Sequence, residues 1–476
     1  MTGVNTLGKS VRTMLRAIPD APGGPHTAAF FDFDGTLLEG IGPLRSGTSR
    51  TAGGNHTAAL LRGLSGRKND AHRASVRRMI SETWRGRPVA DLVSAEERLC
   101  HDHLSRNLYP EAWELVHAHR RAGHTVVLAT SATPFQARIL SRELGIEHLL
   151  CTEPAVADGR FTGAIAGEIV WGSDKADLVE KFAAAHDIDL ANSFAYSNGG
   201  ADIPLLRSTG HPVAVNPDRG LAAAATAGGW PVLRFESRRN SPRHIARTLL
   251  GALAVIGAAG AAFLCSPNSD PRTKRQRLLR WAPTAAFRCA GIRVHVTDTA
   301  NALATRPAVF VFNHQSKLDA LIVPYLVGDS FTPVVTRKAQ RYPIFGRILG
   351  AAGSLFIDRS TPGGAQQALN SLATELHAGN SVAISPEGRI SPTPRLQSFK
   401  KGAFHLATQA QVPIVPIVIR NAGRAMWRNA LTVRPETIEV VILEPIDTAD
   451  WTPETLNEEI AAVRRRYLEA LGTNPC

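Results

Sequence analysis

The sequence predicts an α/β protein with two folded domains. Its 476 residues are too many for one ordinary core, since a domain commonly holds about 100–200 residues. Apolar residues make up 44% and charged residues 20% of the chain, as in globular proteins. Apolar, β-branched runs alternate with helix-like segments through about residue 225, and this alternation favours a parallel sheet. A second α/β region is expected from about residue 285 to residue 476.

The first region opens with an apolar run from Ala28 to Phe31, which leads directly into the letters "DFDGT". A strand that presents acidic side chains at its carboxyl end is a natural metal and phosphate site. Residues from about 39 to 115 alternate Gly/Ser-rich loops with Arg-rich helical stretches, so they are interpreted as an inserted cap.

Further strands of the first region are expected near His124 and from residue 212 to 215. Between them, "SDKADLVEKFAAAHDI" predicts a helix with Ser173 as its N-cap and Lys175 in its first turn. A glycine-containing turn then carries Asn198 and Asp202. The domain is therefore expected over residues 27–225.

The middle segment, residues 236–282, has a different composition. It holds the 17-residue apolar run from Leu249 to Cys265, with basic stretches on both sides. As a helix this run would be roughly 25 Å long, somewhat less than the ~30 Å of a bilayer core. A spanning helix, a helix lying in the membrane interface and a buried helix all remain open. Basic residues on both flanks favour an interfacial helix at the anionic cytoplasmic face of the cell membrane.

The formal net charge of +13 indicates an anionic partner. We find no zinc-finger spacing and no aromatic, basic RNA-binding signature, so nucleic acid is not expected. The five cysteines form no C-x-x-C pair, which fits a reducing compartment without a cysteine metal cluster.

The second region, residues 285–476, contains a candidate general base. An apolar run from Pro307 to Phe312 precedes "NHQSKLD", in which His314 and Asp319 are five positions apart. If they meet across one turn, Asp319 can fix the tautomer of His314 and stabilise the imidazolium that forms when the ring accepts a proton. Taken alone, such a pair is also a common structural feature.

Four segments of the first region, "DFDGT", "LATSAT", "GSDKADL" and "YSNGGADIPLL", resemble in order and spacing the motifs of the haloacid-dehalogenase-like hydrolases. The similarity covers roughly residues 27–220 and is greatest to the phosphoserine phosphatase subgroup. It implies a Rossmann-like parallel sheet with a helical cap and a Mg²⁺-dependent phosphatase. It also implies roles for individual residues: Asp32 as nucleophile, Asp34 as general acid/base, Ser131 (or Thr130) and Lys175 as phosphoryl ligands, and Asp32, Asp34, Asn198 and Asp202 around the metal.

Asn198 departs from this pattern, because the family usually has an aspartate there. An amide oxygen can still coordinate Mg²⁺, but the site loses one negative charge and metal affinity should fall. An active phosphatase and a non-catalytic regulatory module both remain open.

The second region contains "NHQSKLDA", "GSLFIDRS", "AISPEGRIS", "SFKKGAFHLA" and "VPIVPIVI". In this order they resemble the glycerophosphate acyltransferases, particularly the 1-acylglycerol-3-phosphate acyltransferases, over roughly residues 300–425. The resemblance implies an α/β acyltransferase domain in which His314 is the base and Asp319 orients it. Arg359 would bind the acceptor phosphate, Glu387 and Gly388 would complete the acceptor site, and Pro416 would wall an acyl channel.

One acyltransferase block departs from its family. The usual Pro-Glu-Gly-Thr-Arg-Ser is here Pro-Glu-Gly-Arg-Ile-Ser, so Arg389 comes one position early. Arg389 can reach the phosphate, or Lys400 and Lys401 can share that role. Each of these residues, taken singly, can also be an ordinary surface or turn residue.

We therefore expect a membrane-associated enzyme of phospholipid synthesis. It would transfer an acyl group from acyl-CoA or acyl carrier protein to the hydroxyl of a lysophosphatidate-like acceptor. The alternatives are a chain that acts mainly as a phosphatase on phosphoserine or a lipid phosphate, and a chain whose first domain only regulates the second.

Overall fold

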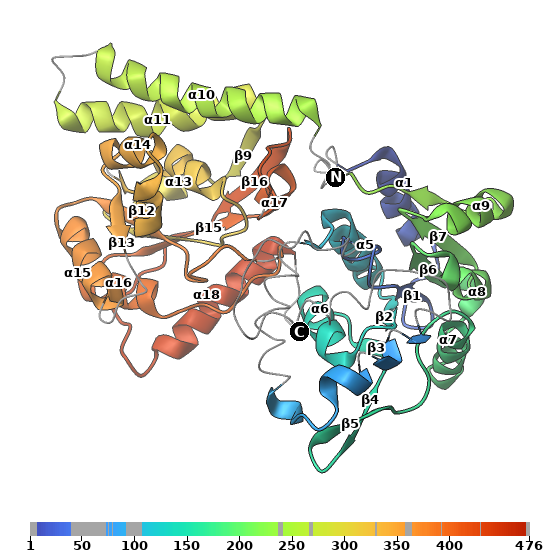
Figure 1. The fold of residues 1–476 in the computed structure, drawn as a ribbon. Helices are drawn as coiled ribbons and strands as arrows, with labels where there is room; N and C mark the ends of the chain where they lie inside the picture. The colour runs from blue at the N-terminus through green and yellow to red at the C-terminus, as the bar shows by residue number, and fades with distance from the viewer. Residues whose placement is uncertain are drawn as a thin grey trace. The chain divides into compact units, whose positions relative to one another are not determined.

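The chain folds into two compact units, of which one is Leu7–Arg239 and the other contains Asn240–Cys476. Figure 1 shows the helices and strands of both. The computed structural model describes residues 7–39, 73–91 without 75 and 79, 107–236, 241–265, 270–328, 331–357, 364–391, 393–428 and 430–472.

The first unit is built on a six-stranded sheet in the order β3-β2-β1-β6-β7-β8, and every neighbouring pair is parallel. The strands are β1 (Ala28–Phe31), β2 (Thr125–Thr130), β3 (His148–Cys151), β6 (Phe194–Ser197), β7 (His211–Val215) and β8 (Val232–Leu233). The helices are α1 (Lys9–Ala17), α5 (Pro110–Arg121), α6 (Pro134–Leu144), α7 (Ser173–Ala185), α8 (Ile203–Ser208) and α9 (Arg219–Gly228). Short 3-10 turns lie at Ile18–Asp20, Leu190–Asn192 and Gly200–Asp202. The predicted parallel sheet is confirmed.

β1 lies in the middle of this sheet because Phe31 pairs with Leu128 of β2 on one side and with Tyr196 of β6 on the other. The acidic motif that follows β1 therefore emerges at the centre of the carboxyl edge, next to the end of β6.

The predicted helix around Lys175 is confirmed, but its N-cap is wrong. α7 begins at Ser173, and the preceding residue, Gly172, takes the cap position with φ of 63°. This left-handed conformation suits glycine. The Ser173 hydroxyl donates to the carboxylate of Asp174 over 3.4 Å and does not cap the helix.

A hairpin formed by β4 (Pro154–Ala157) and β5 (Arg160–Ile165) projects from the first unit. It packs on a short helical segment, Ile80–Trp84, through a cluster that includes Phe161. This segment belongs to the predicted cap, but most of the predicted cap range lies outside the described residues. From Pro110 onward that range forms α5, which packs on β2.

The second unit contains a six-stranded sheet in the order β11-β14-β10-β15-β16-β9, which is parallel except for the antiparallel pair β15–β16. The strands are β9 (Arg293–Thr297), β10 (Val309–Phe312), β11 (Phe331–Thr332), β14 (Ser381–Ile384), β15 (Ile414–Ile419) and β16 (Thr437–Ile442). A separate parallel pair joins β12 (Val334–Thr336) to β13 (Leu355–Ile357). The helices after β9 are α12 (Asn301–Ala304), α13 (Asp319–Val327), η5 (Arg337–Arg341), α14 (Phe345–Ala351), α15 (Gly364–His377), α16 (Gly402–Ala410), α17 (Ala422–Ala425) and α18 (Leu456–Leu471).

The two faces of this sheet contribute to two separate cores. Phe310 packs with one hydrophobic cluster, whereas Val309 and Val311 pack with the other. Side chains of a strand alternate between faces, so β10 is apolar along its whole length because both faces are covered. This burial makes β10 a rigid support for the residues that follow it.

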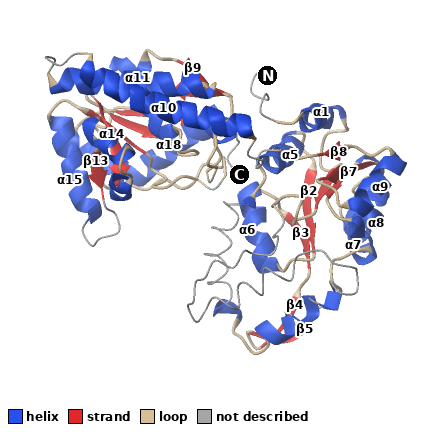
Figure 2. Cartoon of the chain, turned by 45° about the horizontal axis from the view of Figure 1, so that its top comes forward, coloured by secondary structure: helices blue, strands red, loops and turns tan. Residues whose placement is uncertain are grey.

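The segment predicted as a membrane-contact linker forms α10 (Pro242–Leu264) and most of α11 (Pro271–Ala290), and both belong to the second unit. The two helices lie side by side (Figure 2). They approach closely at Gly251, where an added Cβ would lie 3.5 Å from the carbonyl oxygen of Ala286. Val255 and Ala262 complete the buried face of α10.

The opposite face of α10 is exposed and apolar. Leu249, Leu253 and Leu264 are 60%, 62% and 80% exposed. α10 has 23 residues, so it is about 34 Å long, more than its 17-residue apolar run predicts. Ser241 caps it by accepting from the backbone N–H of His244, which explains the earlier start. Among the described residues, α10 is long and apolar enough to cross a membrane, with a mean hydropathy of 1.7 over an 18-residue stretch.

Candidate active sites

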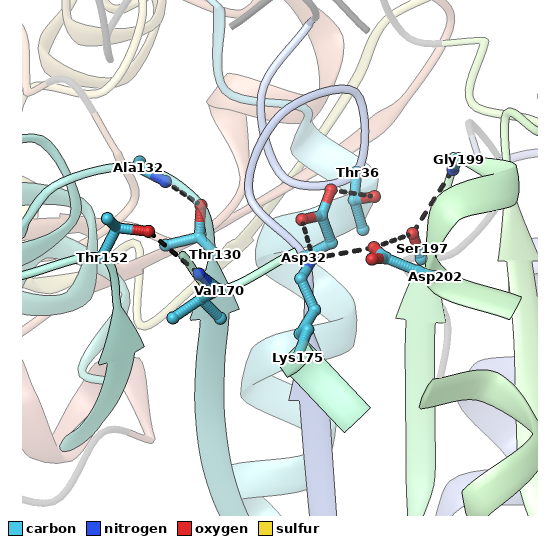
Figure 3. Close-up of polar contacts among 10 residues, drawn as sticks. All are labelled: Asp32, Thr36, Thr130, Ala132, Thr152, Val170, Lys175, Ser197, Gly199 and Asp202. Atoms are coloured by element: carbon cyan, nitrogen blue, oxygen red, sulfur yellow. Dashed lines mark hydrogen bonds and ion pairs between the residues drawn. The ribbon is translucent and has the colours of Figure 1, made fainter. Parts of the chain in front are cut away.

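The first candidate site lies where β1 and β6 end (Figure 3). The Lys175 ammonium, from the first turn of α7, donates to Asp32 Oδ1 and to Asp202 Oδ2, each over 2.8 Å. Ser197, the last residue of β6, also donates to Asp202 Oδ2, over 2.7 Å. Three segments that are distant in the sequence therefore bring a buried cation between two carboxylates, as the motif order predicted.

Burial governs the ionisation of this cluster. It raises the pKa of Asp32 to about 6, although the charge of Lys175 opposes the rise. Burial by itself lowers the pKa of Lys175, but the carboxylates of Asp202 and Asp32 outweigh it and hold this pKa above its ordinary value. Lys175 therefore stays a fixed cation next to the carboxylate of the residue that directly follows β1.

The oxygen atoms near Asp32 fit a magnesium ion in type but are few in number. Asp202 Oδ1 is buried and has no hydrogen-bond partner among the described residues. Asn198 lies against the motif after β1, since a Cβ on Gly35 would be 1.9 Å from Asn198 Nδ2. Carboxylate and amide oxygens are ligands that Mg²⁺ accepts. Within the described ranges no three His, Cys, Asp or Glu side chains gather as a metal site, which agrees with an asparagine at position 198.

The other residues predicted for this site lie along the same edge. Ser131 follows β2 and is buried, while the hydroxyl of Thr130 accepts the backbone N–H of Ala132 over 3.0 Å. Asp34 is half-buried, three residues beyond the end of β1. The roles of Ser131 and Asp34 stay predictions.

The second candidate site follows β10. His314 Nδ1 and Asp319 Oδ2 are 2.8 Å apart, and the same oxygen accepts the backbone N–H groups of Gln315 and Ser316, each over 2.9 Å. Asp319 begins α13 and is fully buried, whereas the His314 side chain is 22% exposed. The predicted contact between the two residues is present, because the short turn between β10 and α13 wraps around one carboxylate oxygen.

Two further side chains fix the backbone of this turn. Asn313 donates to the carbonyl of Ile419 and accepts its N–H over 2.8 and 2.7 Å, so it ties the end of β10 to β15. Glu387 accepts the backbone N–H of His314 over 2.7 Å and that of Gln397 over 2.9 Å. Burial raises the pKa of Glu387, and these two bonds oppose the rise. Sequence reasoning placed Glu387 in the acceptor site, whereas in the structure it supports the base.

Two hollows meet beside His314. The first, named here the polar cavity, has a volume of about 680 Å³ and is lined by His314, Gly388, Arg389 and the residues around η5. The second, the apolar pocket, has about 310 Å³ and lies among residues of α10, α11, α13 and α14. Both are lined by Phe312, Val334, Val335 and Ala383, so they adjoin.

Comparison with known proteins assigns each unit to a family. A family model for haloacid dehalogenase-like hydrolases matches residues 29–207. A Streptomyces azureus protein named inhibition of morphological differentiation protein is 33% identical over 50% of this chain and 91% of its own length. A phosphoserine phosphatase of Mycobacterium tuberculosis is 34% identical over 50% of this chain and 78% of its own length. The chain belongs to the haloacid dehalogenase-like hydrolase family.

The second unit carries an acyltransferase domain, since the acyltransferase family model matches residues 293–420. A 1-acyl-sn-glycerol-3-phosphate acyltransferase of Cocos nucifera is 33% identical over 37% of this chain. The match spans 58% of the coconut protein. Both resemblances that the sequence motifs indicated are confirmed at the level of the family.

Of the other residues predicted for the acyltransferase domain, one is placed differently from expectation. Pro416 is buried in β15 and does not line the apolar pocket, whose walls come mainly from helices. Lys400 lies against Gly388, where an added Cβ would be 3.1 Å from its Nζ. Arg389 lines the polar cavity with His314. Arg359 lies outside the described residues.

Sequence reasoning missed three cations of the acyltransferase domain. Arg337, Lys338 and Arg341, named here the cationic rim, line the polar cavity with His314. Their letters, "RKAQR", look like an ordinary solvated surface run. The signal that could have found them is their position directly after the apolar strand β12.

Proposed function

We propose that the acyltransferase domain transfers an acyl group from a thioester to the hydroxyl of a lysophosphatidate-like acceptor. The observation that carries this proposal is the buried Asp319 carboxylate bonded to His314 where the apolar pocket adjoins the polar cavity. An acyl chain fits the apolar pocket and a phosphate fits the polar cavity, so the base lies between the acyl chain and the phosphate.

The hydrogen bond to Asp319 selects the tautomer of His314. A carboxylate only accepts, so Nδ1 carries the proton and Nε2 is the basic nitrogen. His314 Nε2 would take the proton of the acceptor hydroxyl as its oxygen attacks the thioester carbonyl. The carbon–sulfur bond then breaks, and the thiolate leaves with the proton that His314 returns. No enzyme nucleophile is needed, and Asp319 stabilises the transient imidazolium.

The acceptor phosphate would lie against Arg389 and Lys400, with Arg359 as the third predicted ligand. A guanidinium group suits bidentate phosphate binding. Glu387 contributes indirectly because its two backbone bonds hold the turn that carries His314.

We further propose that α10 attaches this domain to the cytoplasmic face of the cell membrane. Its apolar face is exposed, and the arginines near α10 and α11 suit anionic lipid. A membrane-bound enzyme would receive its fatty substrates from the bilayer. Spanning and interfacial placements are distinguished by protease protection of residues on either side of α10 in sealed vesicles.

For the hydrolase domain we propose a Mg²⁺-dependent phosphomonoesterase. Asp32 would attack the phosphoryl group, Lys175 would neutralise its charge, and Asp34 would supply the proton of the leaving group. Asp32, Asp202, Asn198 and the Asp34 backbone carbonyl would hold the ion, which screens the phosphate charge. The buried, unpartnered oxygen of Asp202 supports this reading.

The acyl transfer is tested by release of the free thiol from an acyl thioester in the presence of lysophosphatidate. The wild-type protein should release thiol at a rate that depends on acceptor, and His314→Ala should abolish that dependence. Full activity in His314→Ala would refute the proposal.

The phosphatase is tested with a generic phosphomonoester at several Mg²⁺ concentrations. Hydrolysis that is absent in Asp32→Asn supports catalysis by this domain. If the wild type shows none and Asn198→Asp restores it, the domain is a regulatory module. In an active wild type, Asn198→Asp should lower the Mg²⁺ concentration needed for half-maximal rate.

A further inference from the structure

A hollow of about 820 Å³, named here the amino-edge pocket, lies in the first unit. Phe194 and His211, the first residues of β6 and β7, line it, and so does Pro231, which directly precedes β8. These strands run parallel to β1, so the pocket lies at the sheet edge opposite to the one where Asp32 follows β1. Catalytic residues of open α/β sheets gather at the carboxyl edge, so the proposed phosphatase does not account for this pocket.

Aromatic rings form part of the wall of the amino-edge pocket. The rings of Phe194 and His211 are stacked, with centroids 4.5 Å apart and planes 20° apart. Phe194 is buried and His211 is exposed, so a further ring can stack on His211. The Trp230 indole lies against the last residue of α9, because a Cβ on Gly228 would be 2.6 Å from Trp230 Nε1. The wall therefore suits a planar, aromatic ligand.

The lining also contains one guanidinium and one carboxylate. Arg207 lies in the last turn of α8, and Asp20 ends the short 3-10 turn after α1. Both residues are exposed. Within the described ranges, neither side chain has an ion-pair or hydrogen-bond partner, and the two do not pair with each other. The pocket thus offers one site for a negative group and one for a positive group.

We propose that the amino-edge pocket binds a small aromatic zwitterion, the chemical class of the aromatic amino acids. The aromatic ring would stack on His211, the carboxylate would pair with Arg207, and the ammonium would pair with Asp20. A guanidinium fork matches a carboxylate in shape. The volume of the pocket is within the usual range of small-molecule sites, about 300–1,000 Å³.

The same lining argues against two other occupants. A phosphomonoester would bring up to two negative charges into a pocket that holds a single guanidinium beside the carboxylate of Asp20. An acyl chain would remove water from Arg207 and Asp20 and give neither of them a partner. An aromatic amino acid supplies a ring, a carboxylate and an ammonium together, so it matches the aromatic wall and both charges.

The amino-edge pocket is separate from the hydrolase site, although one strand reaches both. β6 begins at Phe194 in the pocket wall and ends at Ser197, which donates to Asp202 (Figure 3). None of Asp32, Lys175 and Asp202 lines the pocket. The binding of a zwitterion therefore rests on neither of the two proposed activities.

Calorimetric titration of the full-length chain in detergent micelles tests the proposal with four probes. L-Tryptophan carries the ring and both charges, indole-3-propionate lacks the ammonium, tryptamine lacks the carboxylate, and alanine lacks the ring. The heat of each probe added to micelles alone is subtracted. The test variants are Arg207→Gln and Asp20→Asn. The control variants, Lys181→Gln and Asp177→Asn, lose the same charges from exposed positions of α7 outside the pocket.

Wild-type protein should bind L-tryptophan saturably and each of the other probes about tenfold more weakly. Arg207→Gln should weaken the binding of tryptophan and indole-3-propionate about tenfold and leave tryptamine within about twofold. Asp20→Asn should weaken tryptophan and tryptamine and leave indole-3-propionate unchanged. Both control variants should match wild type with every probe.

Four results would overturn the proposal. The first is a wild type that shows no saturable binding of tryptophan, and the second is equal affinity in wild type and both test variants. The third is equal binding of alanine and tryptophan, which would mean that no ring is recognised. The fourth is binding that is lost in Asp32→Asn but kept in both test variants, which would assign the amino acid to the hydrolase site. Absence of phosphatase or acyl transfer activity would refute only the proposed functions, because the titration needs neither.

Discussion

Replacement of Asp319 by asparagine removes one charge from the acyltransferase site with little change of shape. Asp319 Oδ2 accepts all three hydrogen bonds that the side chain makes to the turn, while Oδ1 is buried without a partner among the described residues. An asparagine oxygen in the place of Oδ2 keeps all three bonds. Its amide nitrogen would take the place of an oxygen that is already unpaired, so Asp319→Asn should fold.

The expected effect on rate follows from the distance to the base. At an effective dielectric constant of about 20, opposite charges about 3 Å apart attract by roughly 5–6 kcal/mol. This is an upper bound, since water reaches the His314 side chain, which is 22% exposed. If the substitution removes about half of this attraction, the activation free energy rises by ~3 kcal/mol and kcat falls by about 100-fold. A fall of this size is within the range of general-base catalysis.

The assay is thiol release under saturating donor and acceptor, with the unfolding midpoint measured in parallel. Asp450→Asn is the control, because Asp450 is exposed in the same unit and distant in sequence from the turn. The KM values should change little. If Asp319→Asn keeps kcat within about fivefold of wild type with a normal midpoint, the carboxylate does not stabilise an imidazolium and the base mechanism is refuted.

Three other perturbations have defined outcomes. Glu387→Gln replaces one of the two carboxylate oxygens that accept backbone N–H groups by an amide that donates. It should lower the free energy of unfolding by about 1–3 kcal/mol and reduce kcat, because the turn that carries His314 loses a hydrogen bond. An unchanged denaturant midpoint would contradict this. Gly35→Ala would place a Cβ at φ of +80° against the Asn198 amide, so it should reduce phosphatase activity and the thermal midpoint, with thiol release unaffected. Burial lowers the pKa of both His119 and His124, so these side chains take up protons when the first unit unfolds at acidic pH. The thermal midpoint of the first unit should therefore fall as the pH drops below the ordinary histidine pKa of 6.5. A midpoint independent of pH from 8 to 5 would contradict this.

The parts of the molecule that the sequence predicted well share a physical cause. β1 and β10 are short apolar runs that are followed directly by polar motifs. The end of each strand can be predicted from the sequence because the side chains change from apolar to polar at that point. Parallel pairing then fixes which motifs become neighbours, so Asp32 and Asp202 could be predicted to meet. The contact of His314 with Asp319 was predictable because it needs only one local turn.

Other features depended on tertiary context. The cationic rim looks like a surface run until β12 is seen to lead into it. The role of Glu387 requires knowing that β14 lies beside β10, which spacing along the chain does not reveal. The β4–β5 hairpin did carry a signal, since Asp158 and Gly159, with φ of 50° and 71°, form an Asp-Gly turn of the kind that favours hairpins.

Each unit closes its own sheet and its own core, and this division has an evolutionary consequence. Position 198 lies in the first unit, and the hydrophobic cluster of its sheet shares no residue with the two clusters of the second unit. Mutations can therefore abolish or alter the hydrolase site without changing the core that supports the acyltransferase site. Because both domains lie on one chain, they are always present in equal numbers.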